Sequence, residues 1–343
     1  MNTCKLCLTQ EANKKGSHIV PHFLLKRVEN IKGKSARDFE LGFAIGEFDT
    51  ESYFGRSVPP ENLEEVFGEI NDEEIQANKH PLVVDHFFCA SCEERFSKVE
   101  SEYAKTMETF ADGVYESGVN GAVAILFWAT VIWRMSINKK SGVFLNDDEN
   151  EVLRQLLDKF LTHDCGMIDR QGMSEDAVVK NVSYKLIRCH SFSHQNITYL
   201  IWHPDFTKVY SILIDEFILC FSVDGNYDEF VDGDFFGLKS EIVASSENNV
   251  QSNEKIHSIG KSKFQLVLLN LVKRVSQERR SRLDEFWDDL HVELGGEGET
   301  MPEFIKQEIM DELTSSEKKM GRKHNLKEIR KCTFKVLSKY GPQ

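Results

Sequence analysis

Two Cys-x-x-Cys pairs constrain this chain more than any other feature of its sequence. Cys4 and Cys7 form the first pair, and 81 residues separate it from the second pair, Cys89 and Cys92. Each spacing lets both sulfur atoms reach one tetrahedral ion at about 2.3 Å, and four thiolates are a ligand set typical of structural Zn²⁺. We expect one zinc ion to tie the N-terminal segment to a distant one. The alternative is four buried thiols without a metal, because an isolated Cys is often a small core residue.

The composition of the 343 residues is that of a folded, soluble protein, with 41% apolar and 29% charged residues. The N-terminus lacks the basic start and apolar stretch of a secretory signal, so we expect a cytoplasmic protein whose cysteines stay reduced. The most apolar run, 122–133, is shorter than the roughly 20 residues of a membrane span and indicates a buried helix. The sequence therefore predicts no membrane association.

Apolar residues recur at helical spacing over much of the chain. Directly after the second Cys pair, Phe96, Val99 and Tyr103 fall on one face with charged residues between them, which is typical of an amphipathic helix. The predicted helices cover 93–110, 122–135, 147–161, 264–290, 302–314 and 325–340.

The central region, 177–243, has short runs rich in β-branched and aromatic residues, broken by turn signals. This pattern predicts a small antiparallel sheet. The following stretch, 245–263, is polar and has almost no large apolar residue, so we expect a linker or long loop there. The predicted strands cover 182–188, 197–203, 209–213 and 217–223.

A short element between the Cys pairs carries the first functional hint. Ser17, His18 and Pro21 belong to the sequence Ser-His-Ile-Val-Pro, and Glu93 directly follows the last Cys. Here the chain resembles the zinc-bearing branch of the HNH endonuclease superfamily, whose fold is a ββα-metal, treble-clef module. In that family a His in an Asp/His-His-x-x-Pro element is the general base. The resemblance covers about 1–105 and implies that His18 is the base and that the four cysteines are structural zinc ligands.

The chain departs from the family pattern at three positions. Ser17 stands where the family has Asp or His, Glu93 where it has Asn, and Val84 where another Asn is expected, with Asp85 beside it. A carboxylate is a good ligand for a hard cation, so Glu93 and Asp85 can still hold a catalytic Mg²⁺ or Mn²⁺. His18 would then deprotonate a water that attacks a phosphodiester. The candidate catalytic residues are therefore His18, Glu93 and Asp85.

Each candidate also has a purely structural interpretation. His18 can be a half-buried residue whose ring donates to a backbone carbonyl. Glu93 can simply favour the first turn of a helix, where a negative charge is stabilised by about 0.3–1 kcal/mol. Because the sequence does not separate these interpretations from the catalytic one, both remain open at this point.

Charge is distributed unevenly along the chain, whose net charge is −14. The segment 38–74 holds twelve carboxylates and one basic residue, Arg56, and we expect it to be a surface insertion that can contact a protein partner. The tail, 314–343, carries a net charge of +7. Because the chain as a whole is acidic, any DNA contact must be confined to a basic region such as this tail. The commoner meaning of such a charge pattern is a helix face exposed to solvent. The candidate phosphate-binding residues of the tail are Lys327, Lys331 and Lys335.

These observations predict an α+β fold in four parts. They are an HNH-like zinc module with its acidic insertion (1–105), helices followed by the sheet (106–244), the linker (245–263) and a helical region with the basic tail (264–343). No nucleotide-binding motif is present. The resemblance implies a metal-dependent DNA endonuclease, of a kind common in bacterial restriction and anti-phage defence. The alternative is a non-catalytic, zinc-stabilised binding or adaptor protein that works with a separate effector, because a closed four-thiolate site does no chemistry itself.

Overall fold

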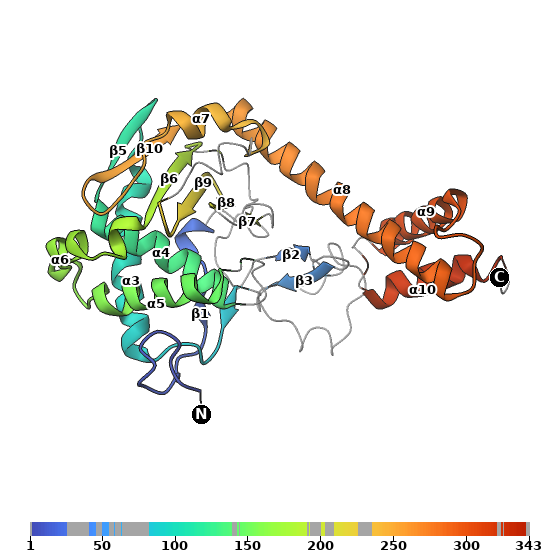
Figure 1. Cartoon of the computed structure of the whole chain (residues 1–343), viewed down its shortest axis with the longest axis horizontal. Helices are drawn as coiled ribbons and strands as arrows, with labels where there is room; N and C mark the ends of the chain where they lie inside the picture. The colour runs from blue at the N-terminus through green and yellow to red at the C-terminus, as the bar shows by residue number, and fades with distance from the viewer. Residues whose placement is uncertain are drawn as a thin grey trace. The chain divides into compact units, whose positions relative to one another are not determined.

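The computed structural model describes most of the chain, in two compact units (Figure 1). The first unit comprises Met1–Val28 and Pro81–Leu271, and the second comprises Glu29–His80 and Val272–Gln343. The units therefore divide the chain differently from the four predicted parts, since 82–105 belongs to the same unit as the sheet. The described residues are 2–25, 41–45, 50–54, 58, 63, 82–138, 143, 145–190, 192, 200–202, 209–225, 235–320, 324 and 326–340.

The first unit is built around one helix, α4 (Gly121–Ile137). All of its residues from Gly121 to Ser136 are buried, which explains the apolar run in the sequence. Such a helix must be covered on all sides. Its core contacts come from α3 (Ala90–Ala104), α5 (Asp147–Phe160) and one face of a sheet. A turn of 3-10 helix, η4 (Lys105–Glu108), extends α3, so the predicted amphipathic helix 93–110 ends earlier than expected.

The sheet has six strands in the order β5-β10-β6-β9-β8-β7. Neighbouring strands are antiparallel except β10 and β6, which are parallel. The predicted runs correspond to β6, β7, β8 and β9, so the antiparallel part of the sheet is as expected. The strands are β5 (Val114–Asn120), β6 (Ser183–Arg188), β7 (Leu200–Trp202), β8 (Tyr210–Ile214), β9 (Phe217–Ser222) and β10 (Asn253–Ser258).

Both faces of the sheet are covered by helices. Along β9, Phe217 and Leu219 face the core around α4, whereas Ile218 and Cys220 face a second apolar cluster. That second cluster is completed by α7 (Lys239–Ala244) and by the first turns of α8 (Lys261–Glu293). Figure 1 shows α7 and α4 on opposite sides of β6 and β9. A strand buried on both faces has no polar alternation, as the apolar run of β9 shows.

The prediction of a linker at 245–263 is wrong. This stretch contains β10, which pairs with β5 on one side and β6 on the other and so lies inside the sheet. Its sequence is polar, but Glu254 and Ile256 point inward and are almost fully buried. The helical middle region also contains a strand that was not predicted, β5, with an alternating buried and exposed pattern.

Glu254 shows how a polar strand fits into the core. Its carboxylate accepts hydrogen bonds from the hydroxyls of Tyr184 (2.6 Å) and Tyr103 (3.0 Å) and from Nε1 of Trp128 (3.1 Å). Burial raises the pKa of this carboxyl, and the hydrogen bonds act in the opposite direction. Because the donors come from β6, α3 and α4, the carboxylate joins the sheet to two helices.

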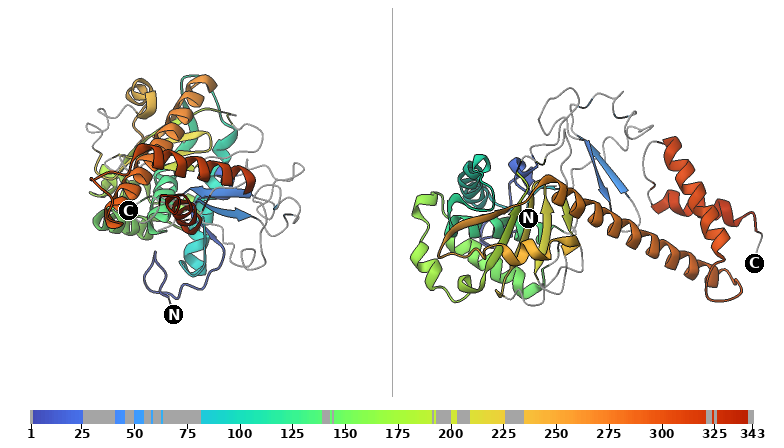
Figure 2. Two further views of the ribbon diagram at one scale, coloured as in Figure 1. Left: turned by 90° about the vertical axis from the view of Figure 1, so that its right-hand side faces the viewer. Right: turned by 90° about the horizontal axis from the view of Figure 1, so that it is seen from above.

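The second unit contains the end of α8, α9 (Glu303–Met320) and α10 (Leu326–Leu337). Figure 2 shows α8 as one unbroken helix. The apolar core of this unit forms around Trp287 of α8, which packs with Ile309 of α9 and Val336 of α10. The acidic segment 38–74 contributes one described hairpin, β2 (Leu41–Ile45) with β3 (Thr50–Phe54), and most of its other residues lie outside the described part of the chain.

We expect Glu254→Ala to lower the free energy of unfolding by at least about 2 kcal/mol, because the buried hydroxyls of Tyr103 and Tyr184 lose the acceptor that they share, at a cost of about 1–3 kcal/mol each. Trp128 Nε1 keeps the Tyr103 oxygen as an acceptor at 3.0 Å. Urea denaturation followed by circular dichroism measures this loss. Glu116→Ala on the exposed face of β5 is the control, with an expected change within about 0.5 kcal/mol. Equal stabilities of the two variants would contradict the role assigned to Glu254.

Candidate metal centre

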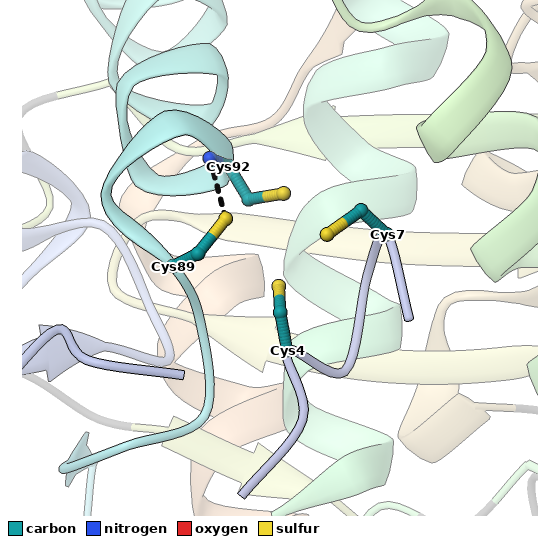
Figure 3. A group of neighbouring side chains, drawn as sticks. All are labelled: Cys4, Cys7, Cys89 and Cys92. Carbon is teal, nitrogen blue, oxygen red and sulfur yellow. Dashed lines mark hydrogen bonds between the residues drawn. The ribbon is translucent and has the colours of Figure 1, made fainter. Parts of the chain in front are cut away.

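The two Cys pairs come together in the structure. The four sulfur atoms form one cluster, in which all lie within 4.8 Å of one another. They belong to Cys4, Cys7, Cys89 and Cys92. Figure 3 shows the side chains pointing toward a common centre. Four convergent sulfurs can hold a metal ion, and the donor set is compatible with structural zinc.

Backbone hydrogen bonds place the two pairs side by side. The N–H of Lys5 donates to the carbonyl of Phe87 at 2.9 Å, which fixes the first pair against the residues that precede the second. Within the first pair, the N–H of Leu8 donates to the carbonyl of Cys4 at 3.0 Å, and Leu8 has a left-handed backbone (φ 56°). Cys89 is the N-cap of α3, and its Sγ accepts from the N–H of Cys92 at 3.4 Å.

The thiols interact strongly because they are so close together. A hydrogen bond from Cys92 lowers the pKa of Cys4 to about 4, and the pKa of Cys92 is raised chiefly because it donates that bond. Burial is the main cause that raises the pKa of Cys89. Four thiolates at this separation repel one another, so all four can be ionised together only beside a cation. This electrostatic requirement fits a divalent ion at the centre of the cluster.

Two arginines connect the cluster to α5. Nη2 of Arg95 donates to Sγ of Cys92 at 3.1 Å and to the Asp158 carboxylate at 2.9 Å. Nη1 of Arg154 donates to the carbonyl of Leu6 at 2.8 Å. The two Cys pairs are therefore both attached to the same helix. Arg95 also brings a positive charge to a thiolate, which stabilises its ionised form.

His18 lies in a short pair of strands next to the cluster. β1 (Ser17–His18) is antiparallel to β4 (Val83–Val84), with Ser17 opposite Val84 and His18 opposite Val83. The side chain of His18 is half-buried, and its ring meets that of His22 edge-on at 5.9 Å between centroids. Val84 stands where the family resemblance leads us to expect Asn. It lies on the strand that pairs with the one carrying His18.

Glu93 lies in the first turn of α3 and is close to Ser17. The Ser17 hydroxyl is near enough to lower the pKa of Glu93, but burial has the larger effect and raises it. Ser17 Oγ and Glu93 Oε1 are both buried, and beyond their interaction with each other neither atom meets a hydrogen-bond partner among the residues that the structure describes. Buried oxygen atoms with so few partners are uncommon in a native protein, and they are donors of the kind that a hard cation prefers.

Arg134 of α4 connects the surroundings of His18 and Glu93, and it was not among the predicted site residues. Its Nη1 donates to the backbone carbonyl of His18 at 2.9 Å, and its Nη2 pairs with Glu100 at 2.5 Å. Its charge also lowers the pKa of Glu93. In the sequence this residue directly follows the apolar run 122–133. A charged residue next to such a run is a candidate for burial, and a buried charge requires partners.

Asp85 follows β4 and takes part in a turn. One of its carboxylate oxygens accepts the N–H of Gly16 at 2.7 Å in an exposed hydrogen bond, which closes the turn before β1. Among the described residues, the four cysteines are the only set of three or more His, Cys, Asp or Glu grouped closely enough to hold a metal. His18, Asp85 and Glu93 are thus near one another in the fold without forming such a group.

The candidate phosphate-binding residues of the tail lie on α10, with Lys327, Lys331 and Lys335 exposed. Lys335 pairs with Glu312 of α9 at 2.5 Å. Lys339, one turn further along the chain, pairs with Glu308 of the same helix at 2.5 Å. Carboxylates of α9 therefore already neutralise part of the positive charge of the tail.

We expect one zinc ion per chain in protein purified without chelator, and we expect Cys89→Ser to lose it and to lower the melting temperature, because metal binding is coupled to folding. Cys165→Ser is the matched control, since Cys165 lies outside the cluster and should leave the zinc content at one. Elemental analysis measures the content. A metal-free wild-type protein would exclude the zinc assignment.

Removal of the hydrogen bond to Cys92 should weaken zinc binding without removing a ligand. We expect Arg95→Met to lower zinc affinity about 10–100-fold, the usual effect of losing a group that orients a ligand. Competition with a chromophoric chelator measures the affinity. Lys98→Met, an exposed change on the same helix, should leave it unchanged. If both variants bound zinc as tightly as the wild type, the contact of Arg95 with Cys92 would have no effect on the metal.

Within the residues that the structure describes, none of the helices combines the length and apolar character needed to cross a membrane. No protein-family model, curated protein or solved structure matches the chain.

Proposed function

We propose that this protein is a divergent HNH-like, metal-dependent endonuclease that cleaves DNA phosphodiesters. The observation that carries the proposal is the arrangement of β1 against the first turn of α3. It puts Ser17, which directly precedes His18 in the chain, beside Glu93, which directly follows the last cysteine of the four-sulfur cluster. Such a reaction needs a general base and a carboxylate that holds the catalytic cation. A structural metal in the cysteine cluster would keep the two residues together.

The donors near Glu93 fit a hard divalent cation. Ser17 Oγ and Glu93 Oε1 are buried oxygen atoms that interact with each other and with no other hydrogen-bonding group of the described residues. Mg²⁺ is commonly held by one or two carboxylates together with substrate phosphate oxygens. When bound, the cation would stabilise the negative charge that develops on the leaving oxygen. Because burial raises the pKa of Glu93, a cation would also favour its ionised form.

The remaining steps belong to side chains of the chain itself. His18 would accept a proton from the attacking water at one of its ring nitrogens. Arg134 holds the backbone of this residue through the carbonyl and thereby limits where the ring can lie. Arg134 is itself fixed by Glu100 and by packing over the ring of Phe96, at 5.0 Å to the ring centroid. A base attached to a fixed backbone keeps its orientation, which is a requirement for efficient proton transfer.

One observation favours the second candidate function, a non-catalytic zinc-stabilised binding protein that works with a separate effector. The guanidinium of Arg134 already provides a positive charge that acts on Glu93. A fixed cation in that position reduces the need for a metal ion, and among the described residues Glu93 belongs to no group of three or more His, Cys, Asp or Glu side chains close enough to hold one. In this function the zinc cluster would stabilise the binding surface alone.

Plasmid cleavage with Mg²⁺ or Mn²⁺ tests the proposal. We expect His18→Ala to lower the cleavage rate about 10²–10⁴-fold, the usual contribution of a general base. Glu93→Gln should lower it similarly, because it removes the carboxylate charge that holds the cation. Zinc content and melting temperature should stay close to those of the wild type, which shows that the loss lies in catalysis.

Matched controls lie next to the tested residues. Glu94→Gln changes an exposed glutamate on the same turn as Glu93, and His163→Ala changes an exposed histidine that pairs with Glu94 at 3.3 Å. Both should retain cleavage. If the wild type does not cleave DNA with either cation, the non-catalytic function is the correct one. If the wild type and His18→Ala cleave equally, His18 is not the base.

A further inference from the structure

The loop that leads into β1 carries two exposed lysines on a fixed backbone. The N–H of Lys14 donates to the carbonyl of Phe88 at 3.0 Å, and the carbonyl of Lys14 accepts from the N–H of His86 at 2.7 Å. The loop therefore runs alongside the residues that precede the second Cys pair. Side chains on such a backbone project from a defined position, which lowers the entropy cost of binding a ligand.

This loop places its two lysines next to the proposed catalytic residues. Gly16 turns the chain with φ of +71°, and its N–H is held by Asp85, so that Ser17 and His18 follow immediately as β1. The backbone of Lys14 is hydrogen-bonded to Phe88, which directly precedes the N-cap of α3, so Lys14 lies beside the start of the helix that carries Glu93. A phosphate bound here would thus be near His18 and Glu93.

The charges of the chain favour this loop over the C-terminal tail as the place where phosphate binds. The first 28 residues contain five basic residues and one acidic residue, although the whole chain has a net charge of −14. The side chains of Lys14 and Lys15 are exposed and have no ion-pair partner among the residues that the structure describes. In the tail, by contrast, Lys335 and Lys339 pair with carboxylates of α9. A lysine already paired with a carboxylate gives up that contact when it binds phosphate.

We propose that Lys14 and Lys15 form a phosphate-binding surface that holds the backbone of duplex DNA against the region of His18 and Glu93. This inference rests on the proposed function for its choice of DNA as the ligand, but it concerns binding and requires no cleavage. Lys acts as a point charge toward phosphate oxygens, so the surface positions the DNA without reading its sequence.

Binding of a fluorescently labelled 20-base-pair duplex, measured at several KCl concentrations without added divalent cation, tests the inference. We expect the double variant Lys14→Gln, Lys15→Gln to bind more weakly on every sequence tried. The slope of log K against log salt should become shallower by up to about two, since each lost phosphate contact contributes about 0.9. Zinc content should remain that of the wild type.

The matched control replaces two exposed lysines elsewhere in the first unit, Lys98→Gln and Lys180→Gln, and should leave affinity and slope unchanged. The inference is overturned if Lys14→Gln, Lys15→Gln binds like the wild type, if the control variant loses binding equally, or if the wild type does not bind DNA. Equal binding of a polyglutamate of similar charge would also overturn it, because the loop would then contact acidic polypeptides. DNA binding through these lysines without any cleavage would refute only the nuclease.

Discussion

The structure depends on the meeting of two segments that are far apart in the sequence, those around Cys4 and Cys89. Four sulfur atoms within 4.8 Å of one another repel each other when ionised, so a cation is what makes their ionised arrangement favourable. The same meeting places β1 beside β4 and the first turn of α3. His18 and Glu93 therefore lie near each other because the two Cys pairs meet.

Buried polar groups then connect this closure to the rest of the first unit. Arg134 joins α4 to β1 and α3, and Arg95 joins α3 to α5. Glu254 does the same on the sheet side, since its carboxylate binds donors from α3, α4 and β6. Such groups are costly to bury without partners. The candidate site is thus supported through hydrogen bonds as well as through apolar packing.

The charges around Glu93 are compatible with both proposed functions, the endonuclease and the non-catalytic binding protein. Glu93 is a carboxyl whose pKa is raised by burial, and the Ser17 hydroxyl beside it acts in the opposite direction. This arrangement fits a site that receives a cation. The positive charges of Arg134 and Lys14 act on the same carboxyl. These two positive charges can hold an anionic substrate near Glu93, and they can equally take the place of a metal ion. Both roles use the same arrangement of residues and differ only in their chemistry.

The sequence by itself determined the helices with a clear apolar period, the strands that are apolar on both faces and the four cysteines, because spacing and hydrophobicity are local properties. The helix α4 and the cluster of Cys4, Cys7, Cys89 and Cys92 could be predicted in this way. The strand β10 could not, because its buried Glu254 becomes acceptable only when tyrosine and tryptophan donors from other elements surround it. The tertiary structure alone decided that Arg134 holds His18 and that Asp85 closes a turn, since both depend on partners distant in the chain.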